Sequence, residues 1–218
     1  DYGITFNVCG QVQMYFIHLR SLVHPQLQQA DKAQCNLAPT QNPNESFCQV
    51  GGLNIPLKSG EQVGTTGDKL AGVYGLDMGA RDYSLYSGRS FVNPDRWCSA
   101  GGNQNIYGRC YTVCPLDYLP QADRAQLSGL FSDGRMTRTD EPRCGTVYQD
   151  YVGTAQGYWV SPGTDPVRTE LPQLFMGQST LASGYHIFVT GTSIPNLPVK
   201  KYIFDTTNSG RVNRAFNS

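Results

Sequence analysis

The sequence has little charge and no long apolar run. Only 16% of its 218 residues are charged, and 17 basic side chains balance 17 acidic ones. A chain without net positive charge has no electrostatic field that would attract nucleic acid or an anionic membrane. No apolar stretch reaches the length of about 18 residues that a membrane-spanning helix needs. We therefore expect no nucleic acid among its partners and no direct membrane insertion.

Histidine is also scarce, since the chain contains only His18, His24 and His186. Hydrolytic zinc needs three protein ligands and an open position for water, and nothing in the spacing of these histidines predicts a shared metal. No Gly-x-Ser-x-Gly elbow is present, and no Gly-Lys-Ser/Thr follows the glycine-rich stretch at 60–67. We expect no bound metal and no cofactor.

The residues that are plentiful favour β-structure. Thirteen Tyr and nine Phe stand against four Met, and 24 Gly and 13 Pro are scattered along the chain. Aromatic residues favour strands, and glycine and proline favour the turns between them. We predict an all-β, disulfide-stabilised protein. The expected strands are 2–8, 12–19, 55–58, 62–64, 72–80, 81–88, 145–152, 157–160, 173–176, 186–189 and 200–204.

Three regions differ in character. Residues 1–92 form an expected β domain, and residues 146–218 form a small β-sandwich or barrel, because short strands alternate there with turn residues. Residues 93–145 are expected to be a cysteine-rich connector. Its one short helix is predicted over 120–131, with a proline near the start and Leu127, Leu130 and Phe131 on one stripe.

Seven cysteines favour disulfides in an oxidising compartment, so we expect an extracellular or cell-surface protein. Their spacing does not match a zinc site. The pairs we expect are Cys35–Cys48, Cys98–Cys110 and Cys9–Cys114, with Cys144 unpaired, although other connectivities fit the spacing. The odd count means that one thiol is free or that its partner lies outside this chain segment, which we expect to be a processed or truncated form.

Two further features suggest surface recognition. Asn44 heads an Asn-Glu-Ser sequon in the polar loop between Cys35 and Cys48, which is either a glycosylation site or a chance match. Four aromatic residues, Tyr148, Tyr151, Tyr158 and Trp159, gather in one expected strand pair. They either pack in the core or form a stacking platform for sugar rings or a partner protein.

Residues 2–86 resemble the lysostaphin-type zinc endopeptidases. The resemblance is carried by Tyr15-Phe-Ile-His18-Leu19, by Lys58-Ser-Gly-Glu-Gln-Val-Gly64 and by the short Gly75-Leu-Asp-Met78 strand. The middle motif also occurs in biotinyl/lipoyl-type β-hammerheads. The resemblance implies an endopeptidase-like sheet or hammerhead, with His18 where the family places a catalytic histidine.

The family's metal ligands are missing from this resemblance. No His-x₃-Asp precedes Val12, and Asp77 stands within the segment where the family has His-x-His. His18 and Asp77 are therefore expected to be a vestigial hydrogen-bonded pair. The region 110–218 resembles C-terminal regions of uncharacterised secreted proteins, which implies that a further cysteine follows beyond residue 218.

Three functions are consistent with these observations. The preferred hypothesis is a non-catalytic secreted or cell-surface structural or binding protein, whose partners are further copies of itself or other extracellular or envelope proteins. One alternative is a zinc metallopeptidase acting on cell-wall peptides, with its first metal motif upstream of Asp1. The other is a carbohydrate-binding module that uses the aromatic residues of 148–159.

Overall fold

The computed structural model describes residues 2–33, 36–39, 46–67, 75–85, 91–94, 109–132, 136–146, 148–160, 173–182, 184–191 and 198–205. Strands dominate the regular structure and form two larger sheets and one hairpin, so the expected all-β class is confirmed. Cys35, Cys98, Asn44 and the side chain of Cys48 lie outside the described residues, and the predictions made for them stay predictions. Within the described part of the chain, no helix has the length and apolar character needed to cross a membrane.

The chain forms two compact units. The first comprises Asp1–Phe6 and Tyr15–Met78, and the second comprises Asn7–Met14 and Gly79–Ser218. The second unit contains both the segment 93–145 and the C-terminal strands. Within this unit, Ala80 of β6 (Asp77–Asp82) pairs with Val113 of β7 (Thr112–Val113).

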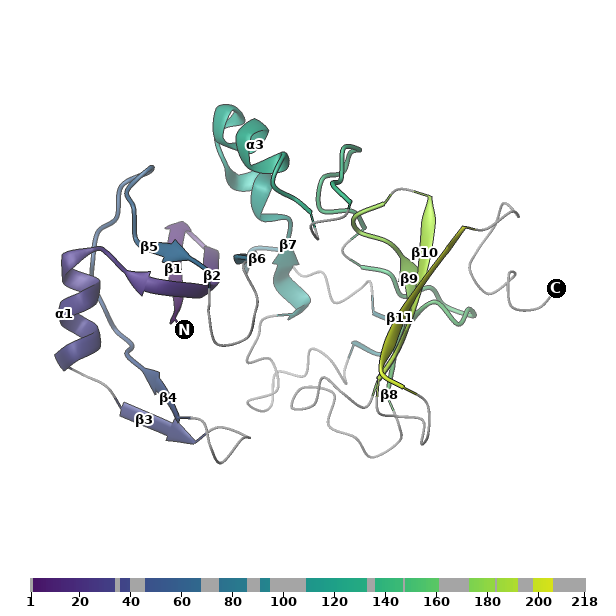
Figure 1. Ribbon diagram of the computed structural model, residues 1–218, viewed down its shortest axis with the longest axis horizontal. Coiled ribbons are helices and arrows are strands. Elements are labelled where there is room, and N and C mark those ends of the chain that lie inside the picture. Colours follow the sequence, from purple (N-terminus) through teal and green to yellow (C-terminus); the bar gives the residue numbers. More distant parts are fainter. Residues whose placement is uncertain are drawn as a thin grey trace. The chain divides into compact units, whose positions relative to one another are not determined.

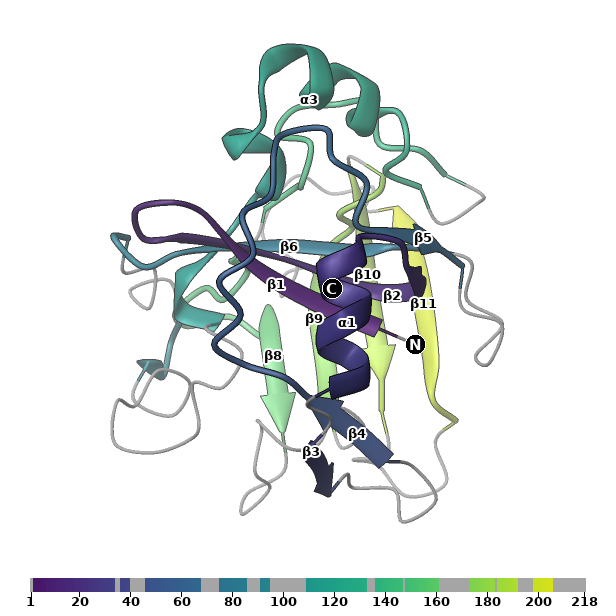
Figure 2. The same cartoon turned by 90° about the vertical axis from the view of Figure 1, so that its left-hand side faces the viewer.

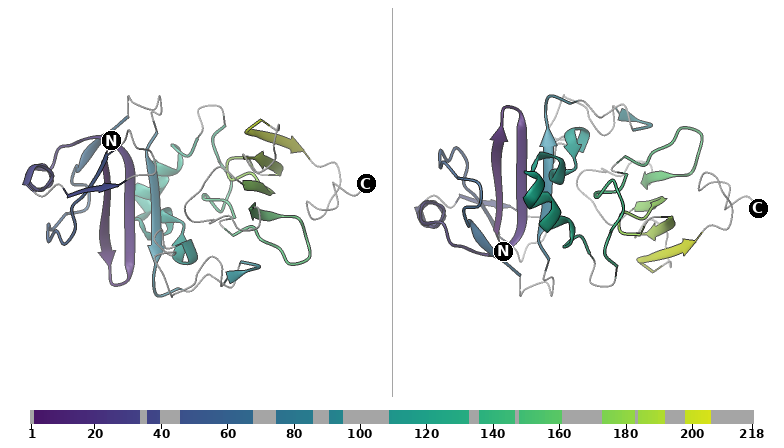
Figure 3. Two further views of the ribbon diagram at one scale, coloured as in Figure 1. Left: turned by 90° about the horizontal axis from the view of Figure 1, so that it is seen from below. Right: turned by 90° about the horizontal axis from the view of Figure 1, so that it is seen from above.

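The first sheet has the order β1-β2-β6-β7, and β5 also pairs with β2. β1 (Tyr2–Cys9) and β2 (Val12–Leu22) form the long hairpin expected from the sequence, and Figure 3 shows them side by side. The turn between them uses Gly10 at φ 49°. Phe6 and Phe16 pack against each other across the two strands, with ring centroids 5.2 Å apart.

β2 changes phase at His18. Before His18, the even-numbered Val12 and Met14 are buried and the odd-numbered Ile17 is exposed. After His18, the odd-numbered Leu19 is buried. A regular strand would keep all its buried side chains at positions of one parity. His18 has φ 69°, which rotates the chain and lets the buried positions change from even to odd numbers.

The rest of the first unit differs from the sequence-based expectation. α1 (Pro25–Ala33) begins with a proline, as helices often do, and its Gln28 N–H donates to His24 O at 3.0 Å. This helix was not predicted, because among its residues whose burial is described only Leu27 is a buried apolar side chain, and the sequence shows no apolar stripe. The strand expected over 55–58 does not form, and β3 (Asn36–Pro39) and β4 (Ser46–Gln49) form a hairpin instead.

The glycines of the stretch 60–67 have two structural roles, namely positive φ angles and close approach of two strands. Gly60 and Gly67 have φ 81° and 99°, which is the backbone conformation that glycine reaches without strain. Gly64 begins β5 (Gly64–Thr66) and does not have a positive φ. A Cβ at Gly64 would lie 2.5 Å from Ser21 O of β2, so glycine is required there for close approach of the two strands.

The C-terminal sheet is the best-predicted part of the chain. β8 (Gly157–Val160), β9 (Gln173–Gln178), β10 (Tyr185–Thr190) and β11 (Lys200–Asp205) are all antiparallel and lie in the order β11-β10-β9-β8 (Figures 1 and 2). All four correspond to predicted runs. The strand expected over 145–152 does not form. Instead, the side-chain amide of Gln149 exchanges two hydrogen bonds with the backbone of Gln178.

Short elements fill the segment before this sheet. They are the 3₁₀ helices η3 (Arg109–Tyr111) and η4 (Pro115–Tyr118) and the helix α3 (Gln121–Ser128). α3 confirms the predicted helix but ends earlier than expected, and Leu130 is exposed rather than part of an apolar stripe.

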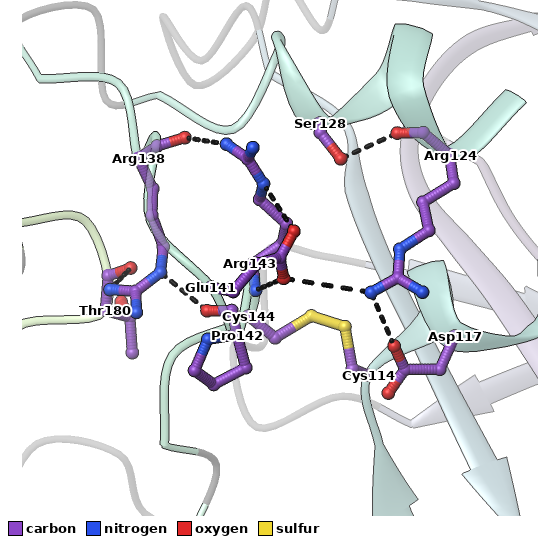
Figure 4. Close-up of a disulfide and its surroundings, with 10 residues drawn as sticks. All are labelled: Cys114, Asp117, Arg124, Ser128, Arg138, Glu141, Pro142, Arg143, Cys144 and Thr180. Atoms are coloured by element: carbon purple, nitrogen blue, oxygen red, sulfur yellow. Dashed lines mark hydrogen bonds and ion pairs between the residues drawn. A yellow bond between two sulfur atoms is a disulfide. The ribbon is translucent and has the colours of Figure 1, made fainter. Parts of the chain in front are cut away.

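A disulfide ties this segment to the residues after α3. Cys114, just before η4, bonds to Cys144 across 30 residues of chain (Figure 4). The expected Cys9–Cys114 pair and the unpaired Cys144 are therefore wrong. Spacing alone had suggested them, but Cys9 is a free, exposed thiol. Cys110 is disulfide-bonded and fully buried.

Charged side chains surround the disulfide in Figure 4. Arg124 of α3 lies 3.3 Å from Asp117 of η4 and 3.7 Å from Glu141, which also accepts from Arg143 Nε at 3.0 Å. Arg138 is buried, and its guanidinium donates to Pro142 O at 2.7 Å and to Thr180 O at 3.1 Å. The Arg124–Glu141 ion pair and the disulfide thus connect the same two stretches of chain.

The double variant Cys114→Ser/Cys144→Ser tests the disulfide. Opening a loop of 30 residues is expected to lower the free energy of unfolding by about 3–4 kcal/mol, which urea denaturation measures. Cys9→Ser is the control and is expected to change it by less than about 0.5 kcal/mol. Peptide mapping without reduction should yield a Cys114–Cys144 peptide, and a Cys9–Cys114 peptide would contradict the assignment.

Candidate functional site

The structure brings His18 and Asp77 together, as the sequence predicts. Nε2 of His18 on β2 lies 3.4 Å from Oδ2 of Asp77 at the start of β6. The imidazole is 27% exposed and the carboxyl 67% exposed, so solvent reaches both. A carboxylate beside a histidine orients the imidazole and supports proton transfer to or from it.

His18 carries backbone strain. Among the described residues it is the non-glycine residue with a positive φ, 69°. A left-handed conformation costs a residue with a side chain about 1–3 kcal/mol and is found disproportionately at functional sites. Across the part of the chain that the structure describes, no three His, Cys, Asp or Glu side chains gather in a way that could hold a metal ion.

A second histidine–carboxylate pair was not expected from the sequence. His24 Nε2 lies 3.4 Å from Glu61 Oε1, and the imidazole is only 9% exposed. The other carboxylate oxygen of Glu61 accepts from Lys58 N at 2.9 Å, which holds the side chain within its own turn. Nδ1 of His24 is buried and has no hydrogen-bond partner.

Strand pairing explains this second pair. Leu22 of β2 pairs with Gly64 of β5, and Val23 N donates to Val63 O at 3.0 Å. The residues just after β2 therefore face those just before β5. The sequence alone does not show that His24 and Glu61 meet, because their proximity depends on the pairing of β2 with β5. His186, the third histidine, is buried on β10 and stacks on Phe204 with centroids 5.9 Å apart.

A buried carboxylate lies at the end of β6. Asp82 Oδ2 accepts from the Tyr118 phenol at 2.7 Å, and Oδ1 accepts from Ser84 N at 2.9 Å and from its hydroxyl. The hydrogen bonds from Ser84 and Tyr118 lower the pKa of Asp82. Burial, followed by the hydrogen bond to Asp82 and its charge, raises the pKa of Tyr118 to about 12. This cluster joins β6 to η4.

The aromatic residues of 148–159 divide into two groups. Tyr148 is structural, since its phenol donates to Thr112 O and its ring meets Phe91 edge-on at 5.5 Å. Tyr158 lies opposite Phe175 of β9. Tyr151 and Trp159 are 41% and 49% exposed, so these two rings are available at the surface.

Tyr118→Phe tests the Asp82 cluster. A carboxyl whose pKa falls on folding stabilises the fold above its ordinary pKa of about 4, and the contribution is lost as the pH falls through the folded pKa. Tyr118, whose pKa is raised, stabilises the fold below about pH 10 and loses this contribution as the pH rises through about 12. We therefore expect Tyr118→Phe to lower Tm at about pH 7 and to have less effect at about pH 3. An equal loss at both pH values would contradict this account, and Tyr202→Phe is the control.

His18→Gly tests the strain at His18. Relief of the left-handed backbone is expected to raise the free energy of unfolding by about 1 kcal/mol, because the exposed pair with Asp77 contributes less than that. The matched control is Thr5→Gly on β1, where glycine in a regular strand is expected to lower the free energy by about 0.5–1 kcal/mol. Chemical denaturation measures both. A loss of stability in His18→Gly would mean that the pair, not the backbone, dominates.

The chain matches no protein-family model, no curated protein and no solved structure. The resemblance of residues 2–86 to lysostaphin-type endopeptidases therefore depends on the quoted sequence motifs alone. What the resemblance implies for the fold and for function remains a proposal.

Proposed function

We propose that the protein is a non-catalytic secreted or cell-surface protein that serves binding or assembly, and that residues 2–86 keep an endopeptidase-like β-scaffold. The observation that carries this proposal is the set of large apolar and aromatic side chains that are exposed in the second unit. Its exposed large side chains include Tyr151, Val152, Trp159, Tyr185, Val199, Tyr202 and Ile203. Aromatic side chains such as Tyr and Trp are enriched where proteins bind partners.

The disulfide supports the proposed location. Disulfides persist in oxidising compartments and are rare where thiol reductants are abundant. The Cys114–Cys144 bond connects segments that contain several short elements, for which covalent closure is an important source of stability. The absence of net charge in the sequence is compatible with association into an extracellular polymer or with attachment to an envelope.

One observation favours a second function, a zinc metallopeptidase whose first metal motif lies upstream of Asp1. His18 occupies a strained, partly exposed position beside Asp77, as a catalytic histidine would. The encoded residues before Asp1 discriminate between the two functions, because the peptidase needs a His-x₃-Asp motif there.

Zinc analysis and peptide cleavage by the full-length chain test the proposed function. We expect less than stoichiometric zinc, no chelator-sensitive hydrolysis of cell-wall peptides, and the same background hydrolysis in His18→Ala. We also expect either self-association in light scattering or saturable sedimentation with the insoluble extracellular polymers of the source cells. Stoichiometric zinc with cleavage that is lost in His18→Ala would establish the peptidase instead.

A further inference from the structure

The strand β11 lies at one end of the C-terminal sheet. It pairs with β10 in a continuous antiparallel register, from the pair of Tyr185 and Asp205 to the pair of Thr190 and Lys200, and no other strand of the described chain pairs with it. Figure 3 shows it in yellow, at one end of the four strands. The outer edge of an end strand presents backbone N–H and C=O groups that can pair with a strand of another chain.

Both faces of β11 are exposed to solvent. Successive residues of a strand point to opposite faces, and the first four residues of β11 are all exposed. Tyr202 on one face is 38% exposed, and Ile203 on the other is 41% exposed. The neighbouring β10, in contrast, contains the fully buried Thr190. A strand added to the outer edge of β11 would therefore cover apolar side chains on both of its faces.

The side chains on one face of β11 are held in place by β10. The ring of Tyr202 stacks on Phe188 with centroids 6.1 Å apart, and Phe204 stacks on His186 at 5.9 Å. Nζ of Lys200 lies 5.1 Å from the centroid of the Tyr202 ring. These contacts order the side chains before any partner binds, so association loses less conformational entropy.

The charges of β11 select one register for pairing with its own copy. Hydrogen-bonded and other pairs alternate along antiparallel strands, so a two-fold axis passes between one residue and the same residue of the copy. An axis at Lys201 would oppose two lysines, which is destabilising. An axis at Tyr202 would place Lys201 opposite Ile203. An axis at Ile203 places Lys201 opposite Asp205 of the copy. The same axis places Tyr202 opposite Phe204, so charges meet opposite charges and rings meet rings.

We propose that β11 pairs antiparallel with β11 of a second copy of this chain, with Ile203 at the two-fold axis. The pairing joins two four-stranded sheets into one continuous sheet. The two-fold axis repeats the contact between Lys201 and Asp205, so each dimer contains it twice. This inference rests on the proposed function in binding or assembly and specifies its partner.

A second copy fits this edge better than an unrelated chain does. Lysines on an end strand usually discourage pairing with other strands. Here Lys201 opposes only the registers that lack a matching carboxylate, and β11 itself supplies that carboxylate at Asp205. Two copies do not repel each other, because the chain has no net charge. Pairing along six residues makes a small interface, so we expect a weak dimer that forms with rising concentration.

Sedimentation velocity of the full chain at about 1 µM to 1 mM tests the inference, because weak dimers dissociate in this range. Cys9→Ser is included in every sample, since its free, exposed thiol could link copies covalently. We expect Lys201→Asp and Asp205→Lys each to weaken the dimer at least about tenfold, because each opposes like charges twice. Lys200→Asp is the matched control. It makes the same change in charge one residue away, opposite no residue of β11, and should leave the dimer intact.

An equimolar mixture of the Lys201→Asp and Asp205→Lys variants gives the sharpest result. Opposite charges meet at both contacts of the mixed pair, so we expect the mixture to form the dimer that neither variant forms alone. Thermal unfolding verifies that each variant is folded. A chain that stays monomeric, a dimer that all variants form equally, or a mixture that stays monomeric would overturn the pairing of β11.

These outcomes separate the inference from the proposed function. Dimers that persist in all variants would mean that self-association uses another surface, and the proposed function would stand. It would also stand if the chain stayed monomeric but sedimented with the extracellular polymers. If the chain neither associated nor sedimented with them, both proposals would fail.

Discussion

The bond between Cys114 and Cys144 is the constraint on which the middle of the second unit depends. The elements that it spans are short: η4 has four residues and α3 has eight. Helices of this length are marginal alone and need tertiary support. Covalent closure provides part of that support, and the ion pair of Arg124 with Glu141 links the same two stretches.

Buried polar side chains form hydrogen bonds that connect separate segments of the second unit. Arg138, Gln149 and Thr190 are buried, and each bonds to backbone atoms of a segment that is distant in sequence or in another strand. Buried polar groups are costly unless they are paired, so each specifies one arrangement of the chain around it. In the part of this unit that the structure describes, directional hydrogen bonds thus help to determine the packing.

Much of the strand content was predictable from the sequence, and the contacts between strands were not. The four runs that became β8 to β11 have apolar or alternating patterns between turn residues, and this local signal was sufficient. α1 was missed because the sequence shows no apolar stripe there, and the Cys114–Cys144 pair was missed because spacing does not show which sulfurs meet. The His18–Asp77 pair was expected through the family resemblance. The His24–Glu61 pair depends on strand pairing, which one sequence does not display.

The stretch 60–67 contains glycines that are required for different structural reasons. Two neighbours, Gly60 and Gly67, are there for backbone rotation, whereas Gly64 is there because Ser21 O occupies the space of a side chain. A Cβ at position 64 would lie 2.5 Å from Ser21 O, so β2 and β5 could not approach each other this closely with a larger residue there. The three glycines are therefore not equivalent turn positions, because Gly64 is required for the short distance between β5 and the backbone of β2.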